Sequence, residues 1–424
     1  MFVLRAAPLG ALCVLLVVSA MGQPATAGTS SLPVPPPALQ AAIRDLWGKN
    51  PQIQAAEANL RAAHERARAA AQPVYNPSLQ LDGENADVDR RTAGASLTLD
   101  VFGKRKARAT QGDAEVRAQE AAFVVERRDV AHDWLKAWSG VALTREQIAL
   151  GQRRLELMRR FDTLAGQRLK VGDISSTERD LAGLALGEAQ IQQASLDAQQ
   201  AEALAALAAL GGEVEGALPD LPQDLPPLAA TIVPALAADR PELRQAQAEQ
   251  ERADAAVTVA DRNRRPDPTI SLTGGQVRSG PRTDRVVGVS VSMPIPLRNS
   301  GRYDVSAARA DADAAYASRR ATELRSNARI KQAQSTYAAM RAASEGFRQG
   351  RAGAFDERAA LLDKLWQAGE ISTSDYLIQL KQSLDTALSG IALESQTWQA
   401  WFDYLAAAGR LTEWVDGNSK EASP

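Results

Sequence analysis

The segment NPQIQAAEANLRAAHERARAAAQPVYNPSL (Asn50–Leu79) returns later in the chain as RPELRQAQAEQERADAAVTVADRNRRPDPTISL (Arg240–Leu272). In both copies a helix-like pattern leads into a short extended segment bounded by prolines. A second pair of segments keeps the same order, VGDISSTERDL from Val171 and AGEISTSDYLI from Ala368. The chain therefore repeats one structural unit, and both copies share a single layout.

Proline marks the same repeat. None occurs between Pro77 and Pro219, and none between Pro296 and Pro424. Proline costs about 3 kcal/mol inside a helix, so each Pro-free tract can hold very long helices. Ala, Leu, Gln, Glu and Arg, which are all good helix formers, dominate these tracts. We therefore expect one long helical hairpin at 104–211 and a second at 302–409.

Between the helical patterns the spacing of apolar residues changes to two. Apolar side chains alternate with small or polar ones in two segments, 77–101 and 267–296, which we assign to β-hairpins. One face of each strand is then apolar. The residues expected on the lipid-facing side are Leu97, Leu99, Val287, Val289 and Val291.

The number of strands limits how such a sheet can span a membrane. A barrel needs about eight strands, and an open edge in lipid leaves backbone groups without partners. Each chain supplies four strands, two per repeat. If these strands span a membrane, several chains must share one barrel, and the fold class is mainly α with a membrane β part.

The first residues have the pattern of an export signal. Arg5 supplies the positive end, Leu9–Ala20 the apolar core and Ala25-Thr26-Ala27 a small-residue cleavage site. The only cysteine, Cys13, lies in this core, so we expect no disulfide and no lipid anchor in the mature chain. The expected units are a signal peptide at 1–27 and structural repeats at 28–213 and 214–424.

Composition and charge exclude several classes of function. Lys plus Arg (49) nearly balances Asp plus Glu (51), and the net charge of -2 comes without a basic run, so no nucleic-acid partner is expected. The mature chain has two histidines, His64 and His132, and no Cys/His metal cluster, phosphate-binding Gly loop or nucleophile elbow. We therefore expect no cofactor, no resident metal and no enzyme activity.

Two less regular patches, Trp138–Thr144 and Met340–Gly353, interrupt the helical tracts near their midpoints. We expect the helical hairpins to turn at these patches. The later segments Gly172-Asp173-Ile174-Ser175 and Gly369-Glu370-Ile371-Ser372 combine a helix-ending glycine with a helix-starting serine. They are expected only to break the returning helices.

The aromatic residues have two expected places. Trp398, Trp401 and Leu405 share one helical face, which favours core packing. Tyr75 and Phe102 lie near strand ends, where aromatic side chains favour the membrane–water boundary.

Several segments, taken with the repeat, resemble the TolC-type outer-membrane efflux factors. They are NPQIQAAEANLRAA, PSLQL, LDVFGKRKAR at the strand-to-helix joint, and the paired VGDIS and AGEIS. The likeness covers nearly the whole mature chain. Within this family, SVSMPIPLRNSGR at Ser290–Arg302 and the absence of a lipid-attachment cysteine resemble the heavy-metal, CzcC-like branch.

The resemblance implies a homotrimer in the outer membrane. Three chains would form a twelve-stranded β-barrel, continued across the periplasm by an α-barrel of helical hairpins. The hairpin ends would meet a periplasmic adaptor and an inner-membrane pump of the RND type. The residues expected at these ends are Gly140, Val141, Ala142, Leu143, Thr144, Arg341, Ala342, Ala343 and Ser344, with Asp133, Glu146 and Glu345 as acidic groups near the periplasmic mouth.

The implied function is passive conduction of exported substrates, with heavy-metal cations as the expected cargo. A duct for drugs, or for polypeptides in type I secretion, is one alternative. A periplasmic coiled-coil scaffold, with small soluble β-hairpins and no pore, is an alternative of a different class.

Overall fold

A computed structural model describes residues 35–85, 87–211, 218–229, 232–350 and 355–417. The expected signal peptide lies outside the described residues. All elements below belong to the unit Leu32–Pro424. The first copy of the repeat consists of α1 (Pro37–Lys49), α2 (Pro51–Ala70), β1 (Ser78–Glu84), β2 (Val88–Thr98), α3 (Lys104–Lys170) and α4 (Ser176–Ala209).

The second copy follows the same order. It consists of the 3-10 turn η2 (Ala237–Asp239), α5 (Pro241–Asn263), β3 (Thr269–Ser279), β4 (Arg282–Ser292), α6 (Arg302–Gln349), α7 (Phe355–Gln367), α8 (Thr373–Ala407) and α9 (Leu411–Asp416). Helices α2 and α5, the quoted copies, both begin with proline, which the first turn of a helix tolerates because its N–H needs no partner there. The Asn50 side chain caps α2 by accepting from Gln52 N (2.8 Å) and Ile53 N (3.2 Å).

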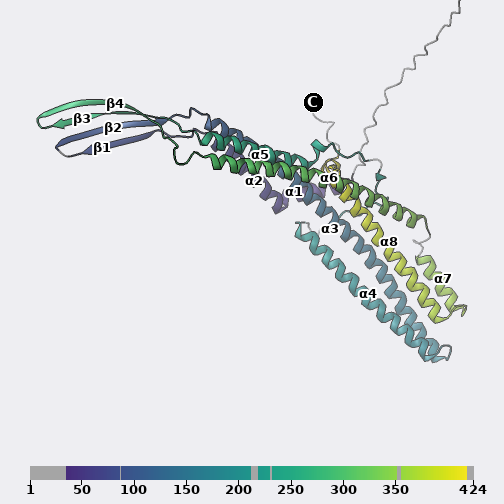
Figure 1. The fold of residues 1–424 in the computed structure, drawn as a ribbon. Helices are drawn as coiled ribbons and strands as arrows, with labels where there is room; N and C mark the ends of the chain where they lie inside the picture. Colours follow the sequence, from purple (N-terminus) through teal and green to yellow (C-terminus); the bar gives the residue numbers. More distant parts are fainter. Residues whose placement is uncertain (1–34, 86, 212–217, 230–231, 351–354, 418–424) are drawn as a thin grey trace, which may run out of the picture. The chain divides into compact units, whose positions relative to one another are not determined.

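The four strands form one antiparallel sheet in the order β1-β2-β3-β4 (Figure 1). The two hairpins join through β2 and β3, with Leu97 opposite Ile270 and Ala95 opposite Leu272. Within the described chain, no further strand pairs with the outer edge of β1 or of β4. Both edges are therefore open to pairing with another chain.

Glycines let the strands approach closely on one side of this sheet. A Cβ added to Gly275 would lie 2.1 Å from the carbonyl oxygen of Arg91, and one added to Gly94 would lie 2.7 Å from the Thr273 side chain. Contacts this short cannot be accommodated without a shift of backbone. The sheet is thus most tightly packed on the side that carries its small residues.

The position of the first helical hairpin corrects the sequence prediction. Helix α3 runs without a break through Trp138–Thr144 to Lys170, over 67 residues and about 100 Å. The chain then turns at Val171–Ser175 and returns along α4, which has 34 residues and is about 50 Å long. The segment predicted to turn, Trp138–Thr144, therefore lies inside helix α3. The segment predicted only to break the returning helix, Gly172–Ser175, forms the turn between the two helices.

Side-chain burial explains this error. The patch Trp138–Thr144 holds aromatic and β-branched residues, which form helices less readily than alanine does. Trp138, Val141 and Leu143 are buried in the structure, so packing against neighbouring helices stabilises the helical conformation there. Tertiary contacts override a weak local preference.

The second copy differs from the first. Helix α6 runs through most of the patch Met340–Gly353, which was also predicted to form a turn, and ends at Gln349; residues 351–353 of that patch lie outside the described residues. Helix α7 begins at Phe355, and the chain reverses at Ala368–Ser372 before α8. Two helices, α6 and α7, thus replace the single α3 of the first copy.

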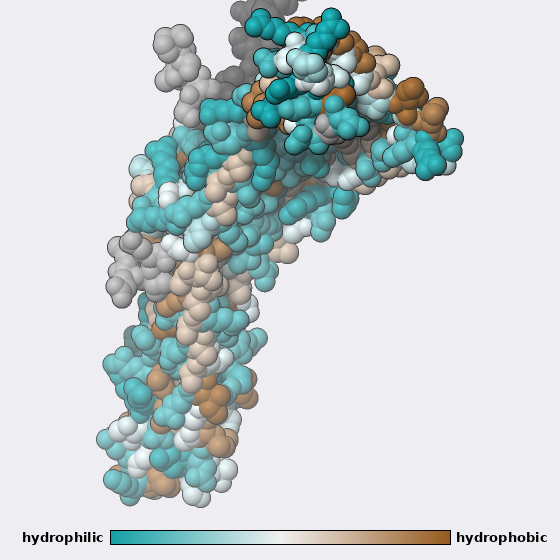
Figure 2. Space-filling model, turned by 90° about the vertical axis from the view of Figure 1, so that its left-hand side faces the viewer, coloured by the Kyte–Doolittle hydropathy of each residue, from teal (hydrophilic) through white to brown (hydrophobic). Residues whose placement is uncertain are grey.

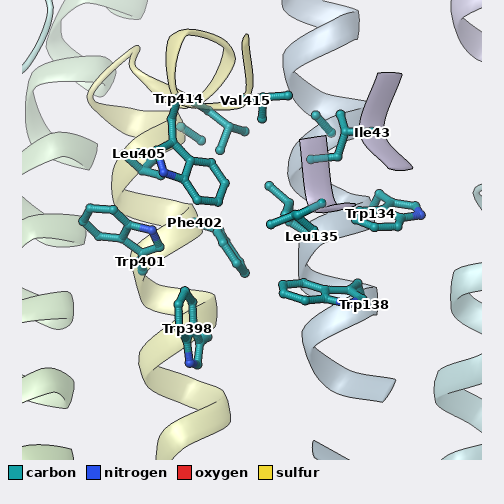
Figure 3. Packing of buried hydrophobic residues seen from close by; sticks show 14 of the residues in the cluster. Ile43, Trp134, Leu135, Trp138, Trp398, Trp401, Phe402, Leu405, Trp414 and Val415 are labelled. Carbon is teal, nitrogen blue, oxygen red and sulfur yellow. The ribbon is translucent and has the colours of Figure 1, made fainter. Parts of the chain in front are cut away.

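Helix α3 packs against α2, α4, α5 and α8, and the largest core lies where α3 meets α8. Leu135 and Trp138 of α3 face Trp398 and Phe402 of α8, with Trp414 of α9 above them, and Trp134 lies on the other side of α3 (Figure 3). The rings of Trp134 and Trp138 stack with centroids 6.2 Å apart. The prediction that Trp398 and Trp401 pack in the core is confirmed.

Candidate functional site

The strand register assigns each side chain of the sheet to one of two faces, because residues directly opposite on antiparallel strands point to the same side. One row joins Leu97, Ile270 and Val291, the next joins Ala95, Leu272 and Val289, and a third ends at Val287. We call this side the apolar face. It comprises Leu79, Leu81, Ala93, Ala95, Leu97, Ile270, Leu272, Gly274, Val287, Val289 and Val291, and further toward the hairpin turns it carries polar residues.

The apolar face is open to the surroundings. Val287, Val289 and Val291 are 81%, 71% and 68% exposed. Four of the five residues predicted to face lipid lie on it, and the fifth, Leu99, is exposed just beyond the end of β2. Valine and leucine in such a continuous exposed set require an apolar environment.

The opposite side, which we call the polar face, is lined mostly by small and hydrophilic residues, with Val88, Val277 and Val286 toward the hairpin turns. Its rows include Ser96 with Ser271 and Ser290, and Gly94 with Thr273 and Gly288. Near the hairpin turns it carries Asp82, Glu84, Arg90, Arg282 and Asp284. Apart from these valines, the side chains of this face can contact water.

A buried ion pair lies where the strands meet the helices. Lys104 Nζ at the start of α3 is 3.0 Å from Asp267 Oδ2, with side chains 9% and 1% exposed. Tyr75 donates a hydrogen bond of 2.9 Å to the same carboxylate. Burial alone would lower the pKa of Lys104, but Asp267 and Tyr75 more than compensate and raise it.

Asp100 fixes the start of α3 at this junction. Its carboxylate accepts from the backbone N–H groups of Lys104 and Arg105, both at 2.7 Å. Burial acts to raise the pKa of Asp100, but these hydrogen bonds hold it below its ordinary value. Tyr75 and Phe102 both lie at this junction, where Arg265 sits 5.9 Å from the centre of the Phe102 ring.

The ion pair leads to a prediction about stability. Asp267→Ala would leave the Lys104 ammonium buried without a counter-charge, and we expect a loss of about 3–5 kcal/mol in the free energy of unfolding. The double variant Lys104→Met/Asp267→Leu, which removes both charges, should recover most of that loss. Denaturant unfolding of the purified proteins measures both, and a double variant no more stable than the single one would contradict the assignment.

The ends of the helical hairpins have matching geometry in the two copies. Gly172 and Gly369 have φ values of 74° and 75°, a left-handed conformation that glycine adopts without strain. In each copy this glycine closes the preceding helix, and a serine, Ser175 or Ser372, caps the next by accepting from the backbone N–H three residues on. The repeated segments are therefore complete turns between antiparallel helices.

The two turns are held together by α3. Arg168 Nη2 donates to the carbonyl oxygen of Gln367 at 3.0 Å, and its guanidinium lies 4.4 Å from the centre of the Trp366 ring. A second core lies beneath, where the Phe161 ring is 4.5 Å from Trp366 and 4.8 Å from Tyr376. These contacts make the two hairpin ends one packed unit.

Apolar side chains also reach the surface in this region. Figure 2 shows brown patches among hydrophilic side chains toward the lower end of the helices. Val171 in the first turn is 80% exposed. The other large exposed apolar residues near this end are Leu169 on α3, Leu184 and Ile191 on α4, Leu361 on α7 and Ile378 on α8.

The residues predicted to dock a partner lie elsewhere. Gly140, Val141, Ala142, Leu143 and Thr144 are inside α3, about 40 Å before its end, since α3 rises 1.5 Å per residue. Arg341, Ala342, Ala343 and Ser344 are inside α6. Their placement at hairpin ends is wrong, and the ends are Val171–Ser175 and Ala368–Ser372 instead.

The side-chain contacts of these residues are those of helix packing. Ser344 is buried and shares a hydrogen bond of 2.7 Å with Thr397 on α8. Arg341 donates from Nε to the carbonyl oxygen of Pro226 at 2.7 Å. Both side chains hold α6 against neighbouring segments.

The three candidate acidic groups are likewise far from the turns. Asp133 lies 3.0 Å from His132, which also contacts Asp403 on α8 at 2.7 Å. Glu345 pairs with Arg341 at 2.9 Å within α6. Their predicted position at a mouth formed by the hairpin ends is therefore wrong.

Glu146 has the most distinctive surroundings of the three. It lines a cavity of about 510 Å³ together with Arg348 and Glu394. Burial, and then the nearby Glu394 carboxylate, raise the pKa of Glu146, against the opposing effect of Arg348. This cavity lies between α3, α6, α7 and α8, and the turns do not line it.

The turn positions could have been found from the sequence. Ser175 and Glu178 form a capping box, in which each side chain bonds the backbone N–H of the other residue. A helix-ending glycine followed within three residues by such a box indicates that one helix ends and another begins. Helix–helix connections commonly have two to eight residues, so this signal favours a full turn.

Two features of the described residues bear on the type of site. None of the helices there is both long and apolar enough to cross a membrane. In the same part of the chain, no group of three or more His, Cys, Asp or Glu side chains is arranged to hold a metal ion.

Known proteins resemble this chain in sequence and in fold. The chain is 25% identical over 390 residues to the cobalt-zinc-cadmium resistance protein CzcC of Cupriavidus metallidurans, covering 88% of this chain and 91% of that protein. It is 26% identical over 346 residues to the nickel-cobalt-cadmium resistance protein NccC of Alcaligenes xylosoxydans xylosoxydans, covering 79% and 76%. Its fold matches the outer-membrane channel OprN with a TM-score of 0.72 at 19% identity, covering 88% and 90%.

The similarity to CzcC and NccC confirms the resemblance that Ser290–Arg302 suggested. The sequence model of a family described as outer membrane efflux protein matches residues 42–213 and 232–410, which correspond to the two copies of the repeat. The chain therefore belongs to the outer membrane efflux protein family.

Proposed function

We propose that this chain forms the outer-membrane duct of a tripartite efflux system and conducts heavy-metal cations passively out of the cell envelope. The observation that carries the proposal is the register of the sheet. It collects most of the apolar residues of the four strands on one face and mainly serine, threonine, glycine and charged residues on the other. A barrel wall between lipid and a water-filled lumen has this distribution.

The duct is shared between copies of the chain. Four strands are too few to close a barrel, and about eight are needed. The free edges of β1 and β4 can pair with neighbouring copies and so satisfy the backbone groups that lipid would leave unpaired. We propose three copies and twelve strands, by likeness to the TolC-type channels. A coiled-coil scaffold would instead leave Val287, Val289 and Val291 in water.

The hairpin ends are the proposed docking points for a periplasmic adaptor and an inner-membrane pump. They are the turns Val171–Ser175 and Ala368–Ser372, which the Arg168 contacts hold together. Val171 exposes an apolar side chain there, as a docking contact requires. A shift of the paired hairpins as one unit would open or close the periplasmic mouth.

Metal cations are the proposed cargo. The names of CzcC and NccC refer to resistance to cobalt, zinc, cadmium and nickel. The polar face carries Asp82, Glu84 and Asp284, but also Arg90 and Arg282. A lining of mixed charge lets ions pass without holding them strongly, which suits a duct whose selectivity lies in its pump.

A resistance profile tests the cargo. Deleting the gene should sensitise the cells to cobalt, zinc, cadmium or nickel and leave tolerance to lipophilic drugs unchanged, because the duct would serve a metal pump. Growth inhibition measured across both sets of compounds gives the result. Drug sensitivity with unchanged metal tolerance would contradict the metal assignment and favour a drug duct.

A further inference from the structure

Three arginines extend the apolar face toward the hairpin turns. Arg91 and Arg285 flank Gln276 on one row, and Arg278 lies on the next row toward the turns. Side chains alternate along a strand, so Arg285 is the next residue on this face after Val287. Arg91 and Arg285 therefore border the apolar residues directly, and Arg278 lies one row further toward the turns, between Asp89 and Thr283.

The arginines are close enough to contact one group. Neighbouring strands lie about 4.8 Å apart, which places the Arg91 and Arg285 backbones about 10 Å from each other across the sheet. Arg278 is displaced by two residues, or about 7 Å, along its strand. Three long side chains on such a triangle can converge on a single anionic headgroup.

The guanidinium groups are available for a ligand. Arg278 and Arg285 have no hydrogen bond or ion pair with any residue that the structure describes. Arg91 Nη2 lies 3.4 Å from Asp89, but the Arg91 side chain is 81% exposed. An ion pair this open to solvent contributes little and does not prevent a second contact.

The other end of the apolar face has a different character. Its last row joins Leu97, Ile270 and Val291 without any charge. Val291 is six positions from Arg285 in the sequence, which corresponds to about 20 Å along the strand. In a bilayer, the apolar residues would contact the hydrocarbon layer and the arginines would lie at the level of the headgroups. Arginine can extend its charged end into the headgroups.

Guanidinium and phosphate match in geometry, since each can form two parallel hydrogen bonds with the other. We infer that Arg91, Arg278 and Arg285 bind the phosphate of anionic lipid headgroups at the hairpin-turn end of the barrel. The inference rests on the proposed function, which places the apolar face in lipid. All four strands join their helices at the opposite end, so these arginines face the outer leaflet when the helices lie in the periplasm.

The chain supplies a matched control. Arg90 and Arg282 lie at the same end of the sheet but on the polar face, where Arg90 is opposite Glu84 and Arg282 is opposite Ser279. They have the same charge and a similar distance from the turns as the proposed ligands. The side of the sheet is the main difference, and Arg91→Gln/Arg285→Gln removes the same number of charges as Arg90→Gln/Arg282→Gln.

The test uses the full-length assembly in neutral detergent. Phosphatidylglycerol, phosphatidylcholine or sodium phosphate is added, and the temperature at which the assembly dissociates is read on gels, together with bound lipid phosphorus. We expect phosphatidylglycerol to raise that temperature in the wild type and in Arg90→Gln/Arg282→Gln. In Arg91→Gln/Arg278→Gln/Arg285→Gln its binding should weaken at least about tenfold, or 1.4 kcal/mol.

Several results would overturn the inference. They are equal responses to phosphatidylglycerol and phosphatidylcholine, equal losses in both variants, or the same stabilisation by free phosphate, which would indicate a simple anion site. If the triple variant does not assemble, Arg285→Gln against Arg282→Gln makes the same comparison. A wild type that needs no detergent would refute the proposed function as well, whereas an assembly without headgroup preference refutes this inference alone.

Discussion

Val289→Arg is expected to prevent the sheet from entering the outer membrane. Val289 lies opposite Leu272 in the middle of the apolar face. An arginine facing lipid near the midplane costs about 2–4 kcal/mol, and the cost recurs in every copy that shares the barrel. The amount of heat-resistant oligomer in outer-membrane fractions measures the effect, and we expect it to fall below detection.

The neighbouring position is the control for this experiment. Ser290 lies opposite Ser271 on the polar face, where an arginine would reach water. Ser290→Arg should therefore leave the oligomer near its wild-type level. Equal losses at both positions would contradict the assignment of the two faces.

Val171→Arg/Ala368→Arg is expected to abolish efflux without disrupting the assembly. Both residues are exposed in the turns, so a long charged side chain can be accommodated in the folded chain. A contact central to a protein interface is commonly worth about 2 kcal/mol or more, which corresponds to a roughly 30-fold loss of affinity for the adaptor. Metal tolerance of cells carrying the variant should fall to that of a deletion strain.

A control on the same helix separates docking from a general effect of charge. Gln152 is exposed on α3, about 28 Å before Val171. Gln152→Arg should leave metal tolerance unchanged. Full tolerance in the turn variant, with the oligomer present, would show that the turns do not dock a partner.

The sheet was predictable because its pattern is simple. A period of two with one apolar face fixes which residues share a side, and a shift of one residue would move all of them to the other side. Leu97, Val287, Val289 and Val291 therefore lie together as predicted. The pairing of β2 with β3 follows once the two hairpins form one sheet.

The hairpin ends were not predicted because the irregular stretch around Trp138 was a more conspicuous turn signal than the capping residues at the true ends. The stretch around Trp138 looks irregular in sequence, yet Trp138 and Leu143 are buried and the helix continues through them. The capping box at Ser175 and Glu178 involves only neighbouring residues, and this segment was predicted only to interrupt the returning helix. Where burial and local propensity disagree, the structure follows burial.

The position of the strand–helix junction was predicted, but its ion pair was not. Lys104 and Asp267 are far apart in sequence, and no spacing rule connects them. The surroundings of the candidate acidic group Asp133 also depend on residues distant in sequence. Its partner His132 contacts Asp403, which lies on another helix. Such pairs follow from the packing of α3 with the elements of the second copy.

The mass of the purified protein tests the central claim most directly. Light scattering on protein extracted from membranes, corrected for bound detergent, gives the number of chains in each particle. We expect three chains, soluble only with detergent, because the apolar face needs lipid and the edges of β1 and β4 need neighbours. A single chain that stays folded and soluble in plain buffer would contradict the claim.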